Sequence, residues 1–287
     1  MKGAIRLAIS LAFGGLANAA QAAPPAPGST YVALGSSYAA GTSLPSLAAD
    51  SPPRCGQGVE NYPRQIARAL DLKLIDRSCG GAVTPHLLRG GQFDQAPQIA
   101  AIAADARLVT ITIGGNDVRF VSDLGEMSCR FRASQGPGPA APDACRPQSA
   151  DFDLERAFAT LADDLHTLAA QIRRQAPQAR IVFVDYITIA PPSGTCVALG
   201  LSEADAERIR QRAARLAALT AKVAAESGSD LIEASRLSRT HDVCSSEPWA
   251  WGYVSPAERE RAGGVGFHPR PEGIAAIAQA VVERLRR

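Results

Sequence analysis

Residues 31–38 read YVALGSSY, an apolar run that ends in a glycine, two serines and a tyrosine. The run predicts a buried strand that stops at Gly35 and places Ser37 in the first turn of the next element. Open parallel sheets bind their ligands at the carboxyl ends of such strands. The first N–H groups of the following element lack helical partners there and can face a developing negative charge. Serine is common at strand ends, so this stretch alone makes Ser37 a candidate and no more.

The rest of the chain alternates between strand-like and helix-like segments. Further strands are expected at 73–77, 107–113, 180–186 and 230–233, and helices at 62–72, 94–104, 153–175, 202–228 and 271–286. Such alternation predicts a parallel sheet that is covered on both faces. The predicted fold class is therefore α/β, a three-layer α/β/α sandwich around a mostly parallel, five-stranded sheet. No repeat or linker divides residues 29–287, which we expect to form a single domain.

Two segments are expected to lie outside this framework. Residues 39–61 are rich in Ser, Pro and Gly and predict a loop. Residues 119–150 carry four prolines and three glycines and predict an excursion that forms no core structure. Nothing in that excursion indicates an amphipathic lid helix.

The N-terminus has the pattern of an export signal. Lys2 and Arg6 precede an apolar stretch at 7–16, and Ala20-Gln21-Ala22 is a small-residue cleavage pattern. We expect residues 1–22 to be a signal peptide and the Pro-rich segment 23–28 to have no packing role. The apolar stretch is too short to span a bilayer, and no later one is long enough. The sequence thus predicts a secreted or periplasmic protein without stable membrane insertion.

Charge and cysteine content narrow the function classes. The 30 basic and 28 acidic residues are spread along the chain and leave a net charge of +2, which excludes the footprint of a nucleic-acid-binding protein. Six cysteines in an oxidising compartment predict disulfides. Of the fifteen possible pairings, the sequential one closes loops of roughly 15 to 50 residues, each stabilising by about 3–4 kcal/mol. No cysteine or histidine spacing typical of a metal site is present.

Two glycine-containing turns follow strands and are candidate binding elements. Gly114-Gly115-Asn116-Asp117 follows the predicted strand 107–113, and its Asn carboxamide is a neutral donor suited to an oxyanion. Gly80-Gly81 follows the strand at 73–77 and can offer a bare backbone N–H. Each pattern alone is more often an ordinary turn.

A general base must come from four histidines. His166 lies in the middle of a predicted helix, where an exposed polar role is expected. His86 is expected to line a pocket or cap a helix, and His241 to be held in a loop near Cys244. His268 immediately precedes the last predicted helix, which can bring it back over the strand ends.

Four short blocks carry a family resemblance, and they span nearly all of the mature chain: Gly35-Ser36-Ser37-Tyr38, Gly81, Gly115-Asn116-Asp117 and His268-Pro269. In order and spacing they resemble the SGNH (GDSL-like) hydrolases, a family with a flavodoxin-like sandwich. The CGGAVT run at 79–84 and the six-cysteine layout look like the secreted Streptomyces-type lipase/esterase branch, in which cysteines pair sequentially. The pairs implied are Cys55–Cys79, Cys129–Cys145 and Cys196–Cys244.

The resemblance implies a role for each matched position. Ser37 would be the nucleophile, and His268 would be the general base and then the acid for the leaving alkoxide. The N–H groups of Ser37 and Gly81 and the side chain of Asn116 would form the oxyanion hole. No metal or organic cofactor is implied.

Two positions depart from the family pattern. Ser36 stands where the family has an aspartate, which makes Ser36 a lesser candidate nucleophile. Val265 stands where the family has the carboxylate that orients the histidine. We therefore expect a Ser–His dyad in which the Val265 main-chain carbonyl orients the ring, with Asp242 or Glu272 as the alternative.

The sequence thus predicts a secreted serine esterase or lipase, a monomer that acts on a small-molecule or lipid ester. The alternatives are a glycan O-deacetylase, a phospholipase, or a non-catalytic binding protein of the same fold. Four aromatic residues precede His268 and either wall an acyl pocket or only pack: Trp249, Trp251, Tyr253 and Phe267.

Overall fold

The structure is a computed structural model that describes residues 24–135, 145, 151–255, 258 and 265–287. These residues form one five-stranded sheet in the order β2-β1-β3-β4-β5, and every neighbouring pair is parallel. The strands are β1 (Thr30–Gly35), β2 (Lys73–Asp76), β3 (Ala106–Thr112), β4 (Arg180–Val184) and β5 (Asp230–Ile232). The predicted fold class and the five predicted strands are confirmed.

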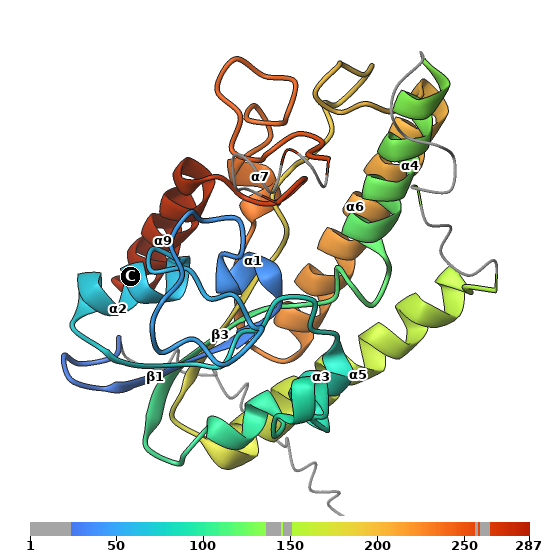
Figure 1. Ribbon diagram of the computed structural model, residues 1–287. Coiled ribbons are helices and arrows are strands. Elements are labelled where there is room, and N and C mark those ends of the chain that lie inside the picture. The colour runs from blue at the N-terminus through green and yellow to red at the C-terminus, as the bar shows by residue number, and fades with distance from the viewer. Residues whose placement is uncertain (1–23, 136–144, 146–150, 256–257, 259–264) are drawn as a thin grey trace, which may run out of the picture.

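The sheet is buried because helices cover both of its faces (Figure 1). Helices α2 (Tyr62–Leu70) and α9 (Pro271–Leu285) pack together on one face, and α5 (Leu154–Gln175) and α6 (Glu203–Glu226) pack together on the other. The central strands β1 and β3 are therefore buried along nearly their whole length and are mainly apolar. The sequence also marks where several helices begin, because Asn61, Asp153 and Ser202 each accept a backbone N–H of the following first turn.

The parallel register places the functional strand ends at one edge. Gly35 pairs with Thr112, so β1 and β3 end side by side, and β2 pairs along the other edge of β1. The segments that follow these strands begin with α1 (Ser37–Ala40) after β1, α3 (Thr84–Leu88) after β2 and α4 (Phe120–Ser134) after β3. Three chain segments with candidate residues thus meet at one place.

Two expectations about local structure are wrong. Residues 120–134 form helix α4 where an irregular excursion was expected, because the prolines that signal irregularity all follow position 135. The helix expected at 94–104 is replaced by two short 3₁₀ turns, η1 (Gln92–Asp94) and η2 (Gln98–Ala101), on either side of Pro97. Proline removes a helical donor and excludes the helical conformation from the residue before it. A last short helix, α7 (Ala234–Leu237), follows β5.

Three disulfides join Cys55 to Cys79, Cys129 to Cys145 and Cys196 to Cys244. The sequential pairing is confirmed. The expected signal peptide at 1–22 lies outside the described residues. At the end of the segment 23–28, the Gly28 N–H donates to the Asp71 carbonyl over 2.6 Å. None of the described helices is both long and apolar enough to cross a membrane.

A buried ion cluster ties the far edge of the sheet to the last helix. The Arg180 guanidinium on β4 donates to Asp230 Oδ2 of β5 through Nε and Nη2, over 3.0 and 2.8 Å. Arg284 of α9 donates to the other carboxylate oxygen over 2.7 Å. The Asp230 carboxylate thereby holds β4, β5 and α9 together.

Candidate active site

The end of β1 is held rigidly at Gly35. Its φ is +144°, and a Cβ there would lie 2.4 Å from the Thr112 carbonyl oxygen, so only glycine fits. The buried carboxamide of Gln98 accepts the Gly35 N–H over 2.8 Å and donates to its carbonyl over 3.1 Å. Gln98 braces the turn that presents Ser37, and no motif in the sequence indicated this role.

Ser37 and His268 meet at this strand end. Nε2 of His268 lies 2.7 Å from Oγ of Ser37, although 231 positions separate the two residues in the chain. Ser37 is 8% exposed and His268 is 6% exposed, so the pair is nearly enclosed. The last helix α9 starts three residues after His268, which matches the expectation that it brings the histidine back over the strand ends.

The second ring nitrogen of His268 faces a different carbonyl from the one expected. Nδ1 lies 2.9 Å from the carbonyl oxygen of Gly266, and the expectation of the Val265 carbonyl is wrong. The Val265 carbonyl instead accepts the backbone N–H of His268 over 3.2 Å, because residues 265–268 form a tight turn. A carbonyl only accepts, so Nδ1 carries a proton and Nε2 presents its lone pair to the Ser37 hydroxyl.

The two carboxylates considered as alternatives bind elsewhere. Asp242 accepts the backbone N–H of Cys244 over 2.8 Å, and Glu272 lies 3.5 Å from Arg270. Among the described residues, no group of three or more His, Cys, Asp or Glu side chains is placed to hold a metal ion.

Two buried tyrosines pack beside the dyad, and sequence reasoning assigned neither of them a role. The Tyr38 ring lies between those of Tyr186 and His268, with centroids 4.6 and 5.0 Å away, and its hydroxyl donates to the Phe267 carbonyl. Burial raises the pKa of Tyr38 well above its usual range and that of Tyr186 to about 12, so both stay protonated. The Tyr186 hydroxyl lies 3.3 Å from Ser36 Oγ. Ser36 therefore bonds to a different partner from Ser37, as expected for adjacent residues.

The candidate oxyanion donors come from the ends of β2 and β3. The Asn116 Nδ2 donates to the Ala82 carbonyl over 2.9 Å, which joins this side chain to the Gly81 block. An amide NH₂ carries two hydrogens, so a second donor remains on the same atom. Gly81 has φ +78°, a conformation that favours glycine. The Gly115 N–H donates to the Tyr186 hydroxyl over 2.9 Å, which fixes the loop ahead of Asn116.

Asp117 supports the same pair of loops from behind. Its Oδ1 accepts both the backbone N–H and the hydroxyl of Thr84, over 2.9 and 2.7 Å. The Thr84 hydroxyl also lies 2.6 Å from Asp164 Oδ2 on α5. Burial raises the pKa of Asp117, with the nearby Asp164 charge acting in the same direction. Asp117 thus connects the β3 loop to the start of α3, next to the Gly81 block.

The other histidines take structural positions. His86 accepts the Val83 backbone N–H over 3.2 Å at the start of α3, which is the expected capping role. His241 stacks on Trp249 with centroids 4.1 Å apart and bonds to the Glu247 carbonyl. His166 faces Glu226 over 3.2 Å on the surface, as expected for an exposed helical histidine.

A cavity of about 280 Å³ adjoins the histidine loop. We call it the α4 groove, and it is lined by Val121, Gly125, Tyr253, Val254, Val265, Gly266 and Phe267. Of the four aromatic residues considered for an acyl pocket, Tyr253 and Phe267 are in this lining. Trp249 instead stacks on His241, and Trp251 lies under the Arg270 guanidinium.

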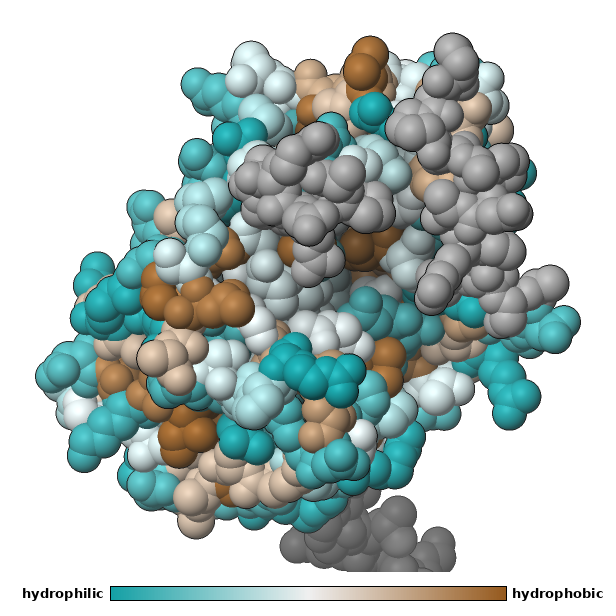
Figure 2. All heavy atoms as spheres, in the orientation of Figure 1, coloured by the Kyte–Doolittle hydropathy of each residue, from teal (hydrophilic) through white to brown (hydrophobic). Residues whose placement is uncertain are grey.

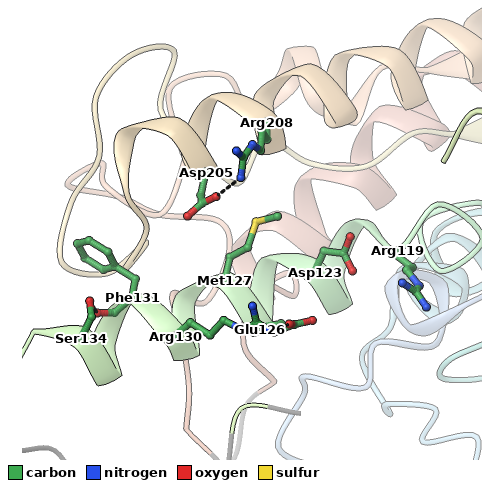
Figure 3. Close-up of a pocket in the computed structure, with 9 residues that line it drawn as sticks. All are labelled: Arg119, Asp123, Glu126, Met127, Arg130, Phe131, Ser134, Asp205 and Arg208. Carbon is green, nitrogen blue, oxygen red and sulfur yellow. Dashed lines mark hydrogen bonds and ion pairs between the residues drawn. The ribbon is translucent and has the colours of Figure 1, made fainter. Parts of the chain in front are cut away.

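Another cavity, of about 490 Å³, is lined by α4 and α6 and is strongly charged (Figure 3). Several of its charges pair with one another, Arg208 with Asp205 over 2.8 Å and Arg130 with Glu126 over 2.5 Å, while Asp123 pairs with Arg212 outside the lining. Figure 3 shows Asp205 and Arg208 on α6, facing the side chains of α4. Neither Ser37 nor His268 lines it, so this cavity does not belong to the dyad.

Comparison with known proteins agrees with this geometry. The profile of the GDSL-like lipase/acylhydrolase family matches residues 33–276. Lipase 2 of Streptomyces coelicolor is 32% identical over 245 residues, which cover 83% of this chain and 81% of that protein. A lipase of Streptomyces rimosus is 29% identical over 266 residues, covering 90% and 87%.

Solved structures show the same relationship. The extracellular lipase of Streptomyces rimosus superposes with a TM-score of 0.69 at 27% identity, covering 90% of this chain and all of that one. Phospholipase A1 of Streptomyces albidoflavus superposes with a TM-score of 0.68 at 26% identity, covering 91% of this chain and all of that one. The chain therefore belongs to the GDSL-like lipase/acylhydrolase family and is a carboxylic ester hydrolase.

Proposed function

We propose that this chain is a secreted serine esterase or lipase that forms an acyl-enzyme on Ser37 with His268 as the general base. The observation that carries the proposal is the 2.7 Å contact between His268 Nε2 and Ser37 Oγ. A serine hydroxyl is a weak nucleophile at neutral pH and needs a base at this distance to remove its proton. Family membership adds the ester as the substrate class.

In the acylation step, Nε2 of His268 takes the Ser37 proton while Oγ attacks the ester carbonyl carbon. The carbonyl oxygen becomes an oxyanion, which accepts bonds from the Ser37 and Gly81 N–H groups and from Asn116 Nδ2. The intermediate then expels the alkoxide, which takes the proton from the imidazolium. In deacylation, Nε2 of His268 takes a proton from water while the water oxygen attacks the acyl carbon. Ser37 Oγ then leaves, takes this proton back, and the carboxylic acid is released.

In the tetrahedral intermediate, the His268 imidazolium is stabilised by the dipole of a backbone carbonyl and not by the negative charge of a carboxylate. The Gly266 carbonyl accepts the Nδ1 proton and holds the ring in the tautomer that the first step requires. Tyr38 supports the same loop, because its hydroxyl donates to the Phe267 carbonyl. The site therefore works as a Ser–His dyad.

We propose that residues 1–22 are a signal peptide that directs export. The three disulfides support this, because disulfides persist in oxidising compartments outside the cytoplasm. N-terminal sequencing of the exported protein is expected to begin at Ala23. Recovery of the uncleaved chain from the cytoplasm alone would contradict this part.

A fluorophosphonate probe tests the nucleophile directly. Wild-type protein is expected to form one covalent adduct on Ser37, and Ser37→Ala is expected to form none. Ser36→Ala is the matched control, because its hydroxyl faces Tyr186 and the variant keeps Ser37 and His268. An adduct that persists in Ser37→Ala, or is lost in Ser36→Ala alone, would assign the nucleophile elsewhere.

The substrate class is tested in the same preparation. The structural likeness to a phospholipase A1 favours phospholipid as a second candidate, so phosphatidylcholine, an acetylated sugar and simple alkyl esters form the panel. The proposal expects alkyl esters to be cleaved with the highest kcat/KM. A preference for the acetylated sugar would make the chain an O-deacetylase.

A further inference from the structure

We propose, building on the function above, that Tyr186 is a positioning residue for ester hydrolysis. Its hydroxyl holds the Gly115–Asn116 loop in place, so that the Asn116 carboxamide can donate to the oxyanion that forms at Ser37. Tyr186 acts through this loop and transfers no proton in the reaction. It lies outside the sequence blocks that carry the family resemblance.

The Tyr186 hydroxyl joins the two segments that the reaction has to keep in register. It accepts the backbone N–H of Gly115 over 2.9 Å and lies 3.3 Å from Ser36 Oγ. Gly115 directly precedes Asn116, and Ser36 directly precedes Ser37. One oxygen atom of a side chain that is 6% exposed therefore connects the strand end that carries the nucleophile to the loop that carries the candidate donor.

Gly115 lies in close contact with the phenol ring of Tyr186. A Cβ at Gly115 would lie 2.6 Å from Cζ and 2.7 Å from the hydroxyl oxygen of Tyr186, which is closer than side chains pack. The φ of Gly115 is outside the left-handed region that favours glycine. The contact with Tyr186, and not the backbone conformation, therefore accounts for glycine at this position.

The bond to Tyr186 holds the loop from the side of β4. On the opposite side of β3, the segment after β2 holds the same loop, because Asn116 Nδ2 donates to the Ala82 carbonyl over 2.9 Å and Asp117 Oδ1 accepts the Thr84 N–H over 2.9 Å. Without the Tyr186 hydroxyl, the loop keeps its bonds to the segment after β2 and loses the one that opposes them. We expect the Asn116 carboxamide to move with the loop.

Tyr186 is itself fixed by its surroundings. It follows the end of β4 by two positions, and the N–H of its neighbour Asp185 donates to the Ile232 carbonyl of β5 over 3.1 Å. Its ring packs against those of Tyr38 and Phe120, with centroids 4.6 and 6.0 Å away. The hydroxyl therefore has a defined position from which it can hold the loop.

The Asn116 loop needs such support because it is not enclosed. Asn116 is partly exposed, whereas Gly115 is buried. Figure 2 shows a hollow in this face of the molecule, between α1 and the half of α4 that is nearer α1. Ser37 begins α1, and the Asn116 loop leads into α4. A donor at such an edge keeps its geometry only where buried contacts fix the backbone that carries it.

The experiment measures kcat and KM on 4-nitrophenyl butyrate for wild type, Tyr186→Phe, Asn116→Ala and the double variant. Tyr186→Phe leaves the buried Gly115 N–H without its acceptor and releases the loop. We expect kcat to fall by about 10- to 30-fold and KM to stay within about twofold, because the carboxamide acts on the oxyanion of the transition state. Asn116→Ala removes the donor completely and should lower kcat by about 100-fold or more.

Tyr31→Phe is the matched control for the loss of a buried phenol hydroxyl. Tyr31 is fully buried, and its hydroxyl lies 2.7 Å from Thr110 Oγ1, between β1 and β3 and away from the Asn116 loop. The variant loses one buried hydrogen bond, as Tyr186→Phe does, and should keep kcat within about twofold. Thermal unfolding verifies that both variants are folded at the assay temperature.

The double variant tests whether Tyr186 acts through Asn116. Once the carboxamide is absent, its position no longer matters, so Tyr186→Phe/Asn116→Ala should have the same kcat as Asn116→Ala alone. Gly115→Ala disturbs the same contact from the loop side and should lower kcat by at least about tenfold. This variant keeps the test valid if Tyr186→Phe does not fold.

The outcomes separate this inference from the proposed function. An unchanged kcat in Tyr186→Phe, an equal loss in Tyr31→Phe, or losses that multiply in the double variant overturn the positioning role and leave the proposed function intact. Full kcat in Asn116→Ala refutes the oxyanion role of Asn116 and the role of Tyr186 with it, while fluorophosphonate labelling still tests Ser37. A wild-type protein that cleaves no ester and forms no adduct refutes the proposed function itself.

Discussion

At the scale of single residues, the strand end that carries Ser37 depends on a glycine, Gly35, that no other residue type can replace without strain. Gly35 at the end of β1 and Gly91 on the surface both have positive φ, +144° and +86°. They differ in space, because a Cβ at Gly35 would meet the Thr112 carbonyl and one at Gly91 meets no described atom within 4 Å. Substituting each of these glycines by alanine therefore separates two contributions to the loss of stability. One is the free energy of a left-handed backbone conformation, and the other is that of a steric clash.

Gly91→Ala is expected to lower the free energy of unfolding by about 1–2 kcal/mol, the cost of a left-handed conformation. Gly35→Ala is expected to lower it by about 3 kcal/mol or more and to abolish activity, because β1 must separate from β3 to admit the methyl group. Urea denaturation and ester hydrolysis measure the two effects. Similar losses in both variants would mean that the close contact at Gly35 is relieved cheaply.

Asp185 makes stability depend on pH in a direction opposite to that of most carboxylates. Burial raises its pKa to about 6, although Ser235 donates to it through both its N–H and its hydroxyl, over 2.9 and 2.6 Å. The folded protein binds this proton more tightly than the unfolded chain does. The stabilising contribution is therefore complete below pH about 4 and is lost as pH rises through about 6, a change of about 3 kcal/mol.

Asp185→Asn is expected to remove this part of the pH dependence. The difference in unfolding free energy between wild type and variant should change by about 3 kcal/mol from pH 4 to pH 7, with wild type losing relative to the variant. Urea midpoints at half-unit pH steps measure it. Parallel pH curves for the two proteins would show that Asp185 titrates normally.

At the scale of elements, the ion cluster on β4, β5 and α9 holds the edge of the sheet. Asp230→Asn leaves Arg180 buried without its charge partner, and the expected loss is about 3–5 kcal/mol of unfolding free energy. Glu155→Gln on the exposed surface of α5 breaks the Arg215 pair and is the control, with no measurable shift of the urea midpoint expected. Equal midpoints for the two variants would show that water reaches the Arg180 site.

The elements that could be predicted from the sequence are those with a strong local pattern. Strand β3 is β-branched and ends in two glycines, and α5 carries its leucines at helical spacing after an N-capping aspartate, so both were identified with nearly the observed bounds. Helix α4 was missed because its apolar spacing is weak and prolines and glycines follow it closely. Its packing against α6, and not its own sequence pattern, accounts for the helix.

The site shows the same division. Ser37, Asn116 and His268 lie in recognisable blocks, and the structure brings Ser37 and His268 within bonding distance. The carbonyl that faces Nδ1 was assigned one residue too early, because the choice between Val265 and Gly266 depends on the turn geometry and not on side-chain identity. Gln98, Tyr38 and Tyr186 act through tertiary contacts, so the sequence indicates no role for their side chains, although Tyr38 stands in the Gly35–Tyr38 block.

At the scale of the whole molecule, two of the three disulfides are expected to contribute equally to stability and unequally to activity. The Cys55–Cys79 bridge closes a span of 24 positions and Cys129–Cys145 one of 16, so each is expected to contribute about 3 kcal/mol. Only the first adjoins the candidate oxyanion loop, since the Gly80 N–H donates to the Cys55 carbonyl over 2.8 Å. Activity should therefore distinguish the two bridges.

Replacing Cys55 and Cys79 together by serine is expected to lower kcat by at least about tenfold at a temperature where the protein is still folded. The double replacement of Cys129 and Cys145 should destabilise by a similar amount and leave kcat within about twofold. Thermal unfolding and initial rates on a short-chain ester supply both measurements. An unchanged kcat in the Cys55/Cys79 variant would mean that the Gly81 loop keeps its place without the bridge, and an equal loss in both variants would attribute the effect to destabilisation.

The 231 positions between Ser37 and His268 mean that the first strand to be synthesised waits for almost the last residues of the chain. Under the proposed mechanism, a nascent or truncated polypeptide that lacks residues 268–287 has the hydroxyl but no imidazole beside it, and it is expected to cleave no ester. Ester hydrolysis would therefore report that the chain has been synthesised through residue 268 and has folded so that His268 contacts Ser37.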